Sequence, residues 1–191
     1  MIIGVGVEGN SDKEFYEKIL FRYFPQIIFK VRNYKNKQEL ISKTPSFWEE
    51  CLNRNYNGCF ILVDSHEQAC ISEVRMLFNK NIIHECRKSI EERNLFICVV
   101  IRGLESWLLA DDGAIKNLFP SANYEPPDDT GIIDPKKTLK KIDLKRIYIS
   151  NKTLLAKQIA AKFNPNRAKL HSPSFAYFWD CLQTKFRLIE S

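Results

Sequence analysis

Two stretches of this 191-residue chain consist almost entirely of apolar residues, and they limit the choice of fold more than any other feature. They are CFILVD at 59–64 and LFICVVIRG at 95–103. Short continuous apolar runs that are rich in β-branched residues are typical of strands buried on both faces, as in parallel sheets. Two further strands are predicted at 2–8 (IIGVGVE) and 26–34 (QIIFKVRNY).

Helical patterns separate these strands. Apolar residues recur at helical spacing from Phe15 to Phe24, after Ser11 and Glu14, which have the spacing of a capping box with Ser11 as N-cap. A second helix is predicted to start at Thr44-Pro45, because proline favours the first helical position. The alternation predicts an α/β fold in which helices flank a four-stranded, mostly parallel sheet.

The C-terminal third contains helical patterns and no convincing strand. Helices are predicted at about 136–143, 151–163 and 173–189. We therefore predict an α/β core at 1–119 and a basic helical extension at 120–191 that packs on it as one compact unit. The last helix carries five apolar residues that we expect in the core: Phe175, Phe178, Trp179, Leu182 and Phe186.

Positive charge is concentrated in this extension. The chain has a net charge of +6, yet the segment from Lys136 to Lys169 holds eleven Lys and Arg residues and one acid, Asp143. The rest of the chain is slightly acidic, with 18 basic and 22 acidic residues. A local basic surplus is the footprint of a polyanion partner, although lysine-rich helices are often only solvated surfaces. The candidate phosphate contacts are Lys136, Lys137, Lys152 and Arg167.

The cysteines and the N-terminal residues indicate the cellular compartment in which the protein works. The six cysteines form no C-x-x-C pair, which favours reduced, buried thiols over zinc or disulfides. The apolar stretch before Gly4 is too short for a signal peptide, and no run has membrane-spanning length. We expect a cytoplasmic protein.

Acidic residues follow three of the four predicted strands. They are Glu8, Asp64 and Glu105. Because the carboxyl ends of parallel strands meet at one edge of a sheet, these side chains are expected to lie near one another. Buried carboxylates need a partner, and converging carboxylates suit Mg²⁺, which polarises phosphoryl oxygens. Each acid alone has a structural alternative, such as a helix cap or a favourable place in a first helical turn.

The stretch Gly4-Val5-Gly6-Val7-Glu8-Gly9 matches G-x-G-x-x-G, a dinucleotide-binding pattern. In that fold the glycines follow the strand, whereas here Gly4 and Gly6 fall within it, and Glu8 would repel a pyrophosphate. We therefore reject a dinucleotide site.

Five stretches together resemble one known family. They are VEGNSDKEFYEKIL, FILVDSHEQAC, IRGLESWLLADD, DPKKTL and HSPSFAYFWDCL. Their order and spacing resemble small stand-alone bacterial TOPRIM-like proteins, which are related to the catalytic module of topoisomerases, primases and OLD-type nucleases. Members of this group are commonly encoded beside an ABC-type or AAA-type ATPase and linked to anti-phage defence.

The resemblance implies a role for each acid. Glu8 matches the TOPRIM glutamate, a proposed general acid or base. Asp64 matches the first aspartate of a D-x-D metal motif, and Glu105 matches the acid of an E-x-W segment near the same site. The resemblance thus implies a metal-dependent nuclease with these three residues as catalytic groups and metal ligands.

One position departs from the family pattern. His66 stands where the second aspartate of D-x-D is expected. Three interpretations remain open: Glu67 supplies the missing oxygen; His66 binds a softer ion such as Mn²⁺ or donates a proton; or the site is catalytically weakened. His66 and Glu67 are therefore candidate metal ligands.

Two functions follow from these observations. The first is a nuclease that uses Mg²⁺ or Mn²⁺ to cut DNA or RNA as the effector of an ATPase-controlled defence system. The second is a degenerate TOPRIM-like module that binds a partner ATPase or nucleic acid without catalysis.

Overall fold

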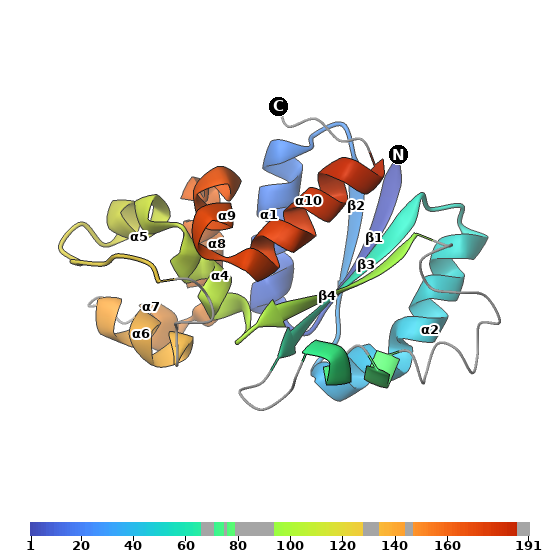
Figure 1. Cartoon of the computed structure of the whole chain (residues 1–191), viewed down its shortest axis with the longest axis horizontal. Helices are drawn as coiled ribbons and strands as arrows, with labels where there is room; N and C mark the ends of the chain where they lie inside the picture. Colours follow the sequence, from blue (N-terminus) through green and yellow to red (C-terminus); the bar gives the residue numbers. More distant parts are fainter. Residues whose placement is uncertain (66–70, 75, 79–93, 128–133, 144–146, 187–191) are drawn as a thin grey trace.

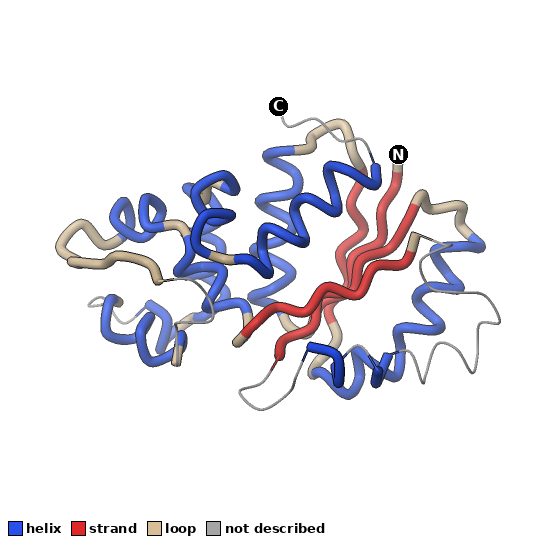
Figure 2. Tube along the Cα trace, viewed as in Figure 1, coloured by secondary structure: helices blue, strands red, loops and turns tan. Residues whose placement is uncertain are grey.

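A single parallel sheet forms the centre of the chain. The computed structural model describes residues 1–65, 71–74, 76–78, 94–127, 134–143 and 147–186. Its strands are β1 (Ile2–Val7), β2 (Ile28–Asn33), β3 (Gly58–Ser65) and β4 (Leu95–Ile101). They lie in the order β2-β1-β3-β4, and every neighbouring pair is parallel (Figure 2). The predicted α/β fold with a four-stranded sheet is confirmed.

Helices cover both faces of this sheet (Figure 1). One face packs against α1 (Asn10–Tyr23) and α10 (Pro173–Phe186), and the other against α2 (Lys37–Asn53). Each side has its own apolar cluster, which explains why β3 is buried at almost every position. The two continuous apolar runs of the sequence are therefore the central strand β3 and its neighbour β4.

The first helix begins earlier than its sequence pattern suggests. Gly9, not Ser11, is the N-cap: its backbone is extended, and its carbonyl accepts a hydrogen bond from the Lys13 amide at 3.1 Å. The predicted capping box is therefore wrong. Because the helix starts at Asn10, Asp12 lies in its first turn, where its side chain is buried.

The second helix also begins earlier, at Lys37 instead of Thr44. Asn36 caps it by accepting a hydrogen bond from the Glu39 amide at 2.9 Å. Pro45 lies inside the helix, which tolerates the missing donor because residues such as Trp48 bury one face against the sheet. This start places Lys37 at the carboxyl end of the sheet instead of in a loop.

The helices that lie between β4 and α10 in the sequence gather beyond the carboxyl end of β4 (Figure 1). One apolar cluster extends from β1 into these helices, so the C-terminal part of the chain packs on the sheet. The predicted division of the chain at residue 120 stays a prediction. The segment ESWLLADDGAIKNLF at 105–119, which has a helical pattern, forms parts of two helices, because the Asp111 side chain caps the second by accepting a hydrogen bond from the Ala114 amide. The helices are α4 (Leu104–Ala110), α5 (Asp112–Leu118), α6 (Pro135–Ile142), α7 (Ile147–Ser150), α8 (Lys152–Lys162) and α9 (Pro165–His171).

Other expectations concern burial. In α10, Phe175, Phe178, Trp179 and Leu182 are fully buried as predicted, whereas the side chain of Phe186 lies outside the described part. The described free cysteines are buried or half-buried. In the described part of the chain, no helix is long and apolar enough to cross a membrane.

Candidate active site at the carboxyl edge of the sheet

Glu8 and Asp64 meet where β1 and β3 end. The Asp64 amide donates a hydrogen bond of 2.8 Å to Glu8 Oε1, which ties the side chain of one strand to the backbone of the next. Burial raises the pKa of Glu8, and the nearby Asp12 carboxylate raises it further, although the amide bond opposes both. Glu8 can therefore hold a proton more readily than an exposed glutamate.

Glu105 lies in the first turn of α4 and is fully buried. Its Oε1 accepts hydrogen bonds from the Tyr148 hydroxyl at 2.7 Å and from Lys152 Nζ at 2.8 Å. Burial alone would raise the pKa of Glu105, but Lys152 and the two hydrogen bonds hold it below its ordinary value. Among the described residues, Oε2 has no hydrogen-bond partner.

Gly103 brings the Asp64 and Glu105 carboxylates to the same small space. Its φ of 92° belongs to the left-handed region, which favours glycine. A Cβ at this position would lie 2.9 Å from Asp64 Oδ2 and 3.4 Å from Glu105 Oε2. The turn after β4 therefore allows both oxygens to approach the backbone. Glu105 Oε2, which has no hydrogen-bond partner among the described residues, lies beside the same glycine as Asp64 Oδ2.

Asp12 is a fourth acid of the site. It lies on α1 with only 8% of its surface exposed, and burial raises its pKa to about 6. Lys152 and the backbone amides of Asp12 and Gly9 lower this pKa, and the Glu105 carboxylate raises it.

Asp64 experiences all of these charges together. Burial raises the pKa of Asp64 well above its ordinary value, and the fields of Asp12, Glu8 and Glu105 raise it further. Only Lys152 opposes them among its principal influences. Four carboxylates from β1, α1, β3 and α4 therefore form one electrostatically coupled group, which we call the carboxylate cluster.

Two lysines flank this cluster. Lys152, the first residue of α8, pairs with Glu105, and its pKa is raised because the attraction of the carboxylates outweighs the effect of burial. Lys37, the first residue of α2, donates a hydrogen bond of 2.9 Å to the backbone carbonyl of Asp64. Both cations are placed by capped helix starts, at Asn151 and Asn36 respectively.

The other predicted contact residues lie in different environments. Lys136 and Lys137 are exposed on α6. Arg167 pairs with the fully buried Asp111, with 2.6 Å between Nε and Oδ1, so its guanidinium is held in a structural contact. His66 and Glu67 lie outside the described residues.

The chemistry of the cluster fits a hard divalent cation. All four side chains offer carboxylate oxygens, the ligands that Mg²⁺ and Mn²⁺ accept, and one oxygen of Glu105 lacks a partner within the described structure. Across the described ranges, no three His, Cys, Asp or Glu side chains are already arranged as a metal site.

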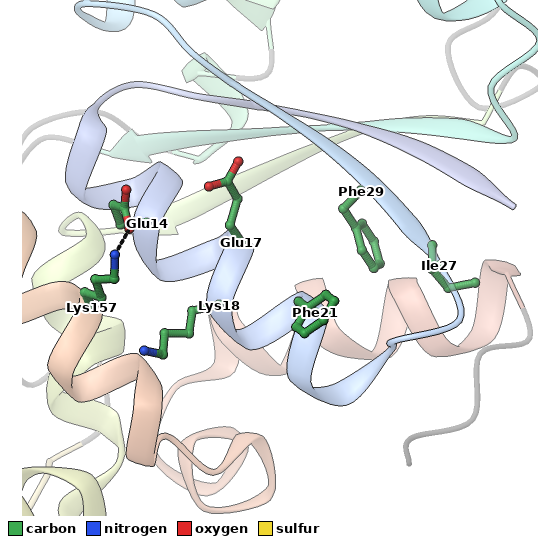
Figure 3. Close-up of a pocket in the computed structure, with 7 residues that line it drawn as sticks. All are labelled: Glu14, Glu17, Lys18, Phe21, Ile27, Phe29 and Lys157. Carbon is green, nitrogen blue, oxygen red and sulfur yellow. Dashed lines mark ion pairs between the residues drawn. The ribbon is translucent and has the colours of Figure 1, made fainter.

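A separate surface hollow lies between α1 and β2, with a volume of about 380 Å³. Figure 3 shows the ion pair between Glu14 and Lys157 at one end of it, with 3.2 Å between Oε2 and Nζ. None of the clustered carboxylates lines it. The lining residues are Glu14, Glu17, Lys18, Phe21, Ile27, Phe29 and Lys157.

Four residues of this region were not assigned to it from the sequence. The capping-box pattern of Ser11 and Glu14 draws attention away from Asp12, although its position four residues after Glu8 is a usable signal. Lys152 was predicted as a phosphate contact and not as the partner of Glu105. Lys37 and Tyr148 carried no local signal, because their roles depend on where α2 and α7 lie against the sheet.

Comparison with solved structures shows which fold this chain has. The C-terminal region of the Burkholderia pseudomallei OLD protein is similar over 94% of this chain and 98% of its own, with a TM-score of 0.52 and 14% identity. The C-terminal region of the Xanthomonas campestris pv. campestris OLD protein matches 97% of this chain and 98% of its own, with a TM-score of 0.48 and 16% identity. The first of these similarities shows that the chain has a TOPRIM-like fold, as the sequence resemblance predicted.

The family assignment is more direct. The family model described as a domain of unknown function (DUF4276) matches residues 7–183, and the chain belongs to this family. No curated protein sequence matches the chain.

Proposed function

We propose that this protein is a divalent-metal-dependent nuclease of TOPRIM type that cleaves phosphodiester bonds in DNA or RNA. The observation that carries the proposal is the carboxylate cluster, in which Glu8, Asp12, Asp64 and Glu105 share one edge of the sheet. Four acids with coupled charges are costly to keep together in a fold, unless a cation or a proton neutralises part of the charge.

The residues divide into three tasks. Asp64, Asp12 and Glu105 would hold the cation, which would polarise the phosphoryl oxygen and lower the pKa of an attacking water. Glu8, whose raised pKa favours a protonated form, would carry a proton to or from the reacting oxygens. Lys37 and Lys152 would bind the phosphates that flank the scissile bond.

The resemblance to stand-alone TOPRIM-like proteins extends the proposal to a partner. We infer that the protein is a cytoplasmic effector subunit controlled by an ABC-type or AAA-type ATPase in anti-phage defence. The exposed lysines of α6, Lys136 and Lys137, would add contacts to nucleic acid along the basic C-terminal part.

Glu8→Gln is expected to reduce cleavage by at least about 100-fold, the usual contribution of a general acid or base. The amide oxygen can still accept the Asp64 hydrogen bond, so the fold should be retained. The assay incubates wild type and variant, with and without the ATPase encoded nearby, with plasmid DNA and tRNA in Mg²⁺ or Mn²⁺. Equal cleavage by both proteins would remove Glu8 from the mechanism, and absence of cleavage by wild type under every condition would contradict the nuclease proposal.

The affinity for Mn²⁺ is expected to rise with pH. The pKa of Asp12 is about 6, and those of Glu8 and Asp64 are also raised, so protons compete with the cation below neutrality. Titration calorimetry from pH 5 to pH 8, in buffers with different ionisation enthalpies, should show proton release on binding. Asp12→Asn should reduce this release, whereas a constant affinity across the range would contradict the prediction.

One observation favours a second function, a binding or regulatory module without catalysis. Within the described residues, no three potential ligands are arranged around a common point, and the sequence has His66 in place of the second aspartate of D-x-D. If calorimetry detects no Mg²⁺ or Mn²⁺ binding while nucleic acid or the ATPase still binds, this second function is the correct one.

A further inference from the structure

Tyr16 is a buried side chain that the proposed mechanism does not use. It lies on α1 with none of its surface exposed, and among the described residues its hydroxyl has no hydrogen-bond partner. Buried tyrosine hydroxyls usually find a partner, and an unpaired one costs free energy that a phenylalanine would avoid. The hydroxyl therefore needs an explanation beyond packing.

The position of Tyr16 directs it to the carboxylate cluster. It follows Asp12 by four residues on the same helix, and long helical side chains lean toward the N-terminus, over the residue one turn before. Burial raises the pKa of the phenol, and the charges of Asp12, Asp64, Cys98 and Glu8 raise it further, with Asp12 the strongest of the four.

The ring of Tyr16 is fixed by two segments far away in the sequence. It makes edge-to-face contacts with Trp107 at 5.8 Å and with Phe178 at 5.9 Å between ring centroids. Trp107, two residues after Glu105, in turn donates an indole hydrogen bond of 2.8 Å to Ser174. The E-x-W segment and α10 therefore hold this ring in one orientation.

The chemistry of the neighbouring side chains favours a carboxylate as the acceptor for the Tyr16 hydroxyl. A carboxylate has only acceptor sites, whereas a phenol beside it can donate. Asp12 is the buried acid one helical turn before Tyr16, and the backbone amides of Gly9 and of Asp12 itself donate to its carboxylate. A cation bound to Asp12 would fix the orientation of this carboxylate and leave one of its oxygens free to accept a hydrogen bond from the Tyr16 hydroxyl. Residues that orient metal ligands usually do so through such a hydrogen bond.

We propose that Tyr16 is a positioning residue: when Asp12 binds a divalent cation, the Tyr16 hydroxyl donates a hydrogen bond to the Asp12 carboxylate and holds it in place as a ligand. This inference rests on the proposed function. It also gives a role to the hydrogen bond between Trp107 and Ser174, which fixes the indole that packs against the Tyr16 ring.

The test separates positioning from packing. Tyr16→Phe keeps the ring contacts and removes only the hydroxyl. We expect the melting temperature of the metal-free variant to equal or exceed that of wild type, because an unpaired buried group is removed. We expect its Kd for Mn²⁺, measured by titration calorimetry, to weaken by about 10-fold to 100-fold.

The matched control is Tyr34→Phe. Tyr34 is also a buried tyrosine, but it belongs to the apolar cluster on the α2 face of the sheet, where its ring contacts Phe47. Removing this hydroxyl should leave the Kd for Mn²⁺ unchanged.

The outcomes are distinct. An unchanged Kd in Tyr16→Phe, with normal binding by wild type, overturns the role of Tyr16 and leaves the proposed function intact. A fall in both melting temperature and affinity makes the residue structural and also overturns the proposal. No Mn²⁺ binding by wild type itself contradicts the proposed function, and the inference with it.

Discussion

Asp64→Asn is expected to abolish cleavage while making the metal-free protein more stable. Asp64 lies among three other acids, and burial together with their fields raises its pKa well above its ordinary value. An acid whose pKa is raised by folding destabilises the folded protein when it is charged, so stability is lost as pH rises through the raised pKa. Asparagine removes this charge without changing the size of the side chain.

The two expected effects have opposite signs. Loss of a ligand that stabilises transition-state charge should reduce cleavage by about a thousandfold or more, equivalent to several kcal/mol. The free energy of unfolding without metal should increase by about 1 kcal/mol at pH 8, because like-charge repulsion is relieved. At pH 5 the gain should be smaller, since wild-type Asp64 is then closer to neutral.

Denaturant unfolding with a chelator present, at pH 5 and pH 8, measures the second effect. Asp112→Asn is a suitable control, because it removes one carboxylate that pairs with Lys116 at 2.8 Å outside the cluster. This control should retain cleavage and gain no stability. If Asp64→Asn is less stable than wild type at pH 8, the repulsion inferred within the cluster is wrong.

The strands, and the acids that follow them, were accessible from sequence because they depend on local composition. Continuous apolar runs at 59–64 and 95–103 correspond to β3 and β4, and an acid after a strand necessarily lies at the carboxyl edge. The proximity of Glu8, Asp64 and Glu105 followed from that rule alone.

The rest of the cluster depends on features with no local signature. The sequence pattern does not reveal Asp12, because it starts the helix two residues too late and so does not show this side chain as a buried residue of the first turn. Lys152 reaches Glu105 only because α8 packs along α1 and lies beside α4, a long-range arrangement. The buried phenol of Tyr16 looked like any other apolar position of an amphipathic helix.

Lys152→Met is expected to cause the largest loss of stability. Glu105 is fully buried, and this substitution leaves its carboxylate with the Tyr148 hydrogen bond and no paired cation. Breaking a buried ion pair from one side costs about 3–5 kcal/mol. Because the Lys152 side chain is 36% exposed, solvent screens part of the interaction, and we expect a loss of about 2–3 kcal/mol at pH 8.

The pH dependence gives a sharper test of the same substitution. In wild type, the pKa of Glu105 is lower in the folded protein than in the unfolded chain. Glu105 therefore adds to the free energy of unfolding above its pKa in the unfolded chain, and this contribution is lost as pH falls through its pKa in the folded protein. Without Lys152, burial dominates and raises the pKa, so stability is instead lost as pH rises. The difference between wild type and variant should therefore shrink from pH 8 to pH 5.

Lys157→Met, on the same helix, is the matched control for this pair of measurements. Its Nζ lies 3.2 Å from Glu14 Oε2, but the two side chains are 53% and 35% exposed, so the pair should contribute about 1 kcal/mol or less. Denaturant unfolding of both variants at the two pH values isolates the burial of Glu105 as the cause. Equal losses in the two variants, or a Lys152→Met deficit that grows toward pH 5, would show that Glu105 does not depend on Lys152 as a buried charge.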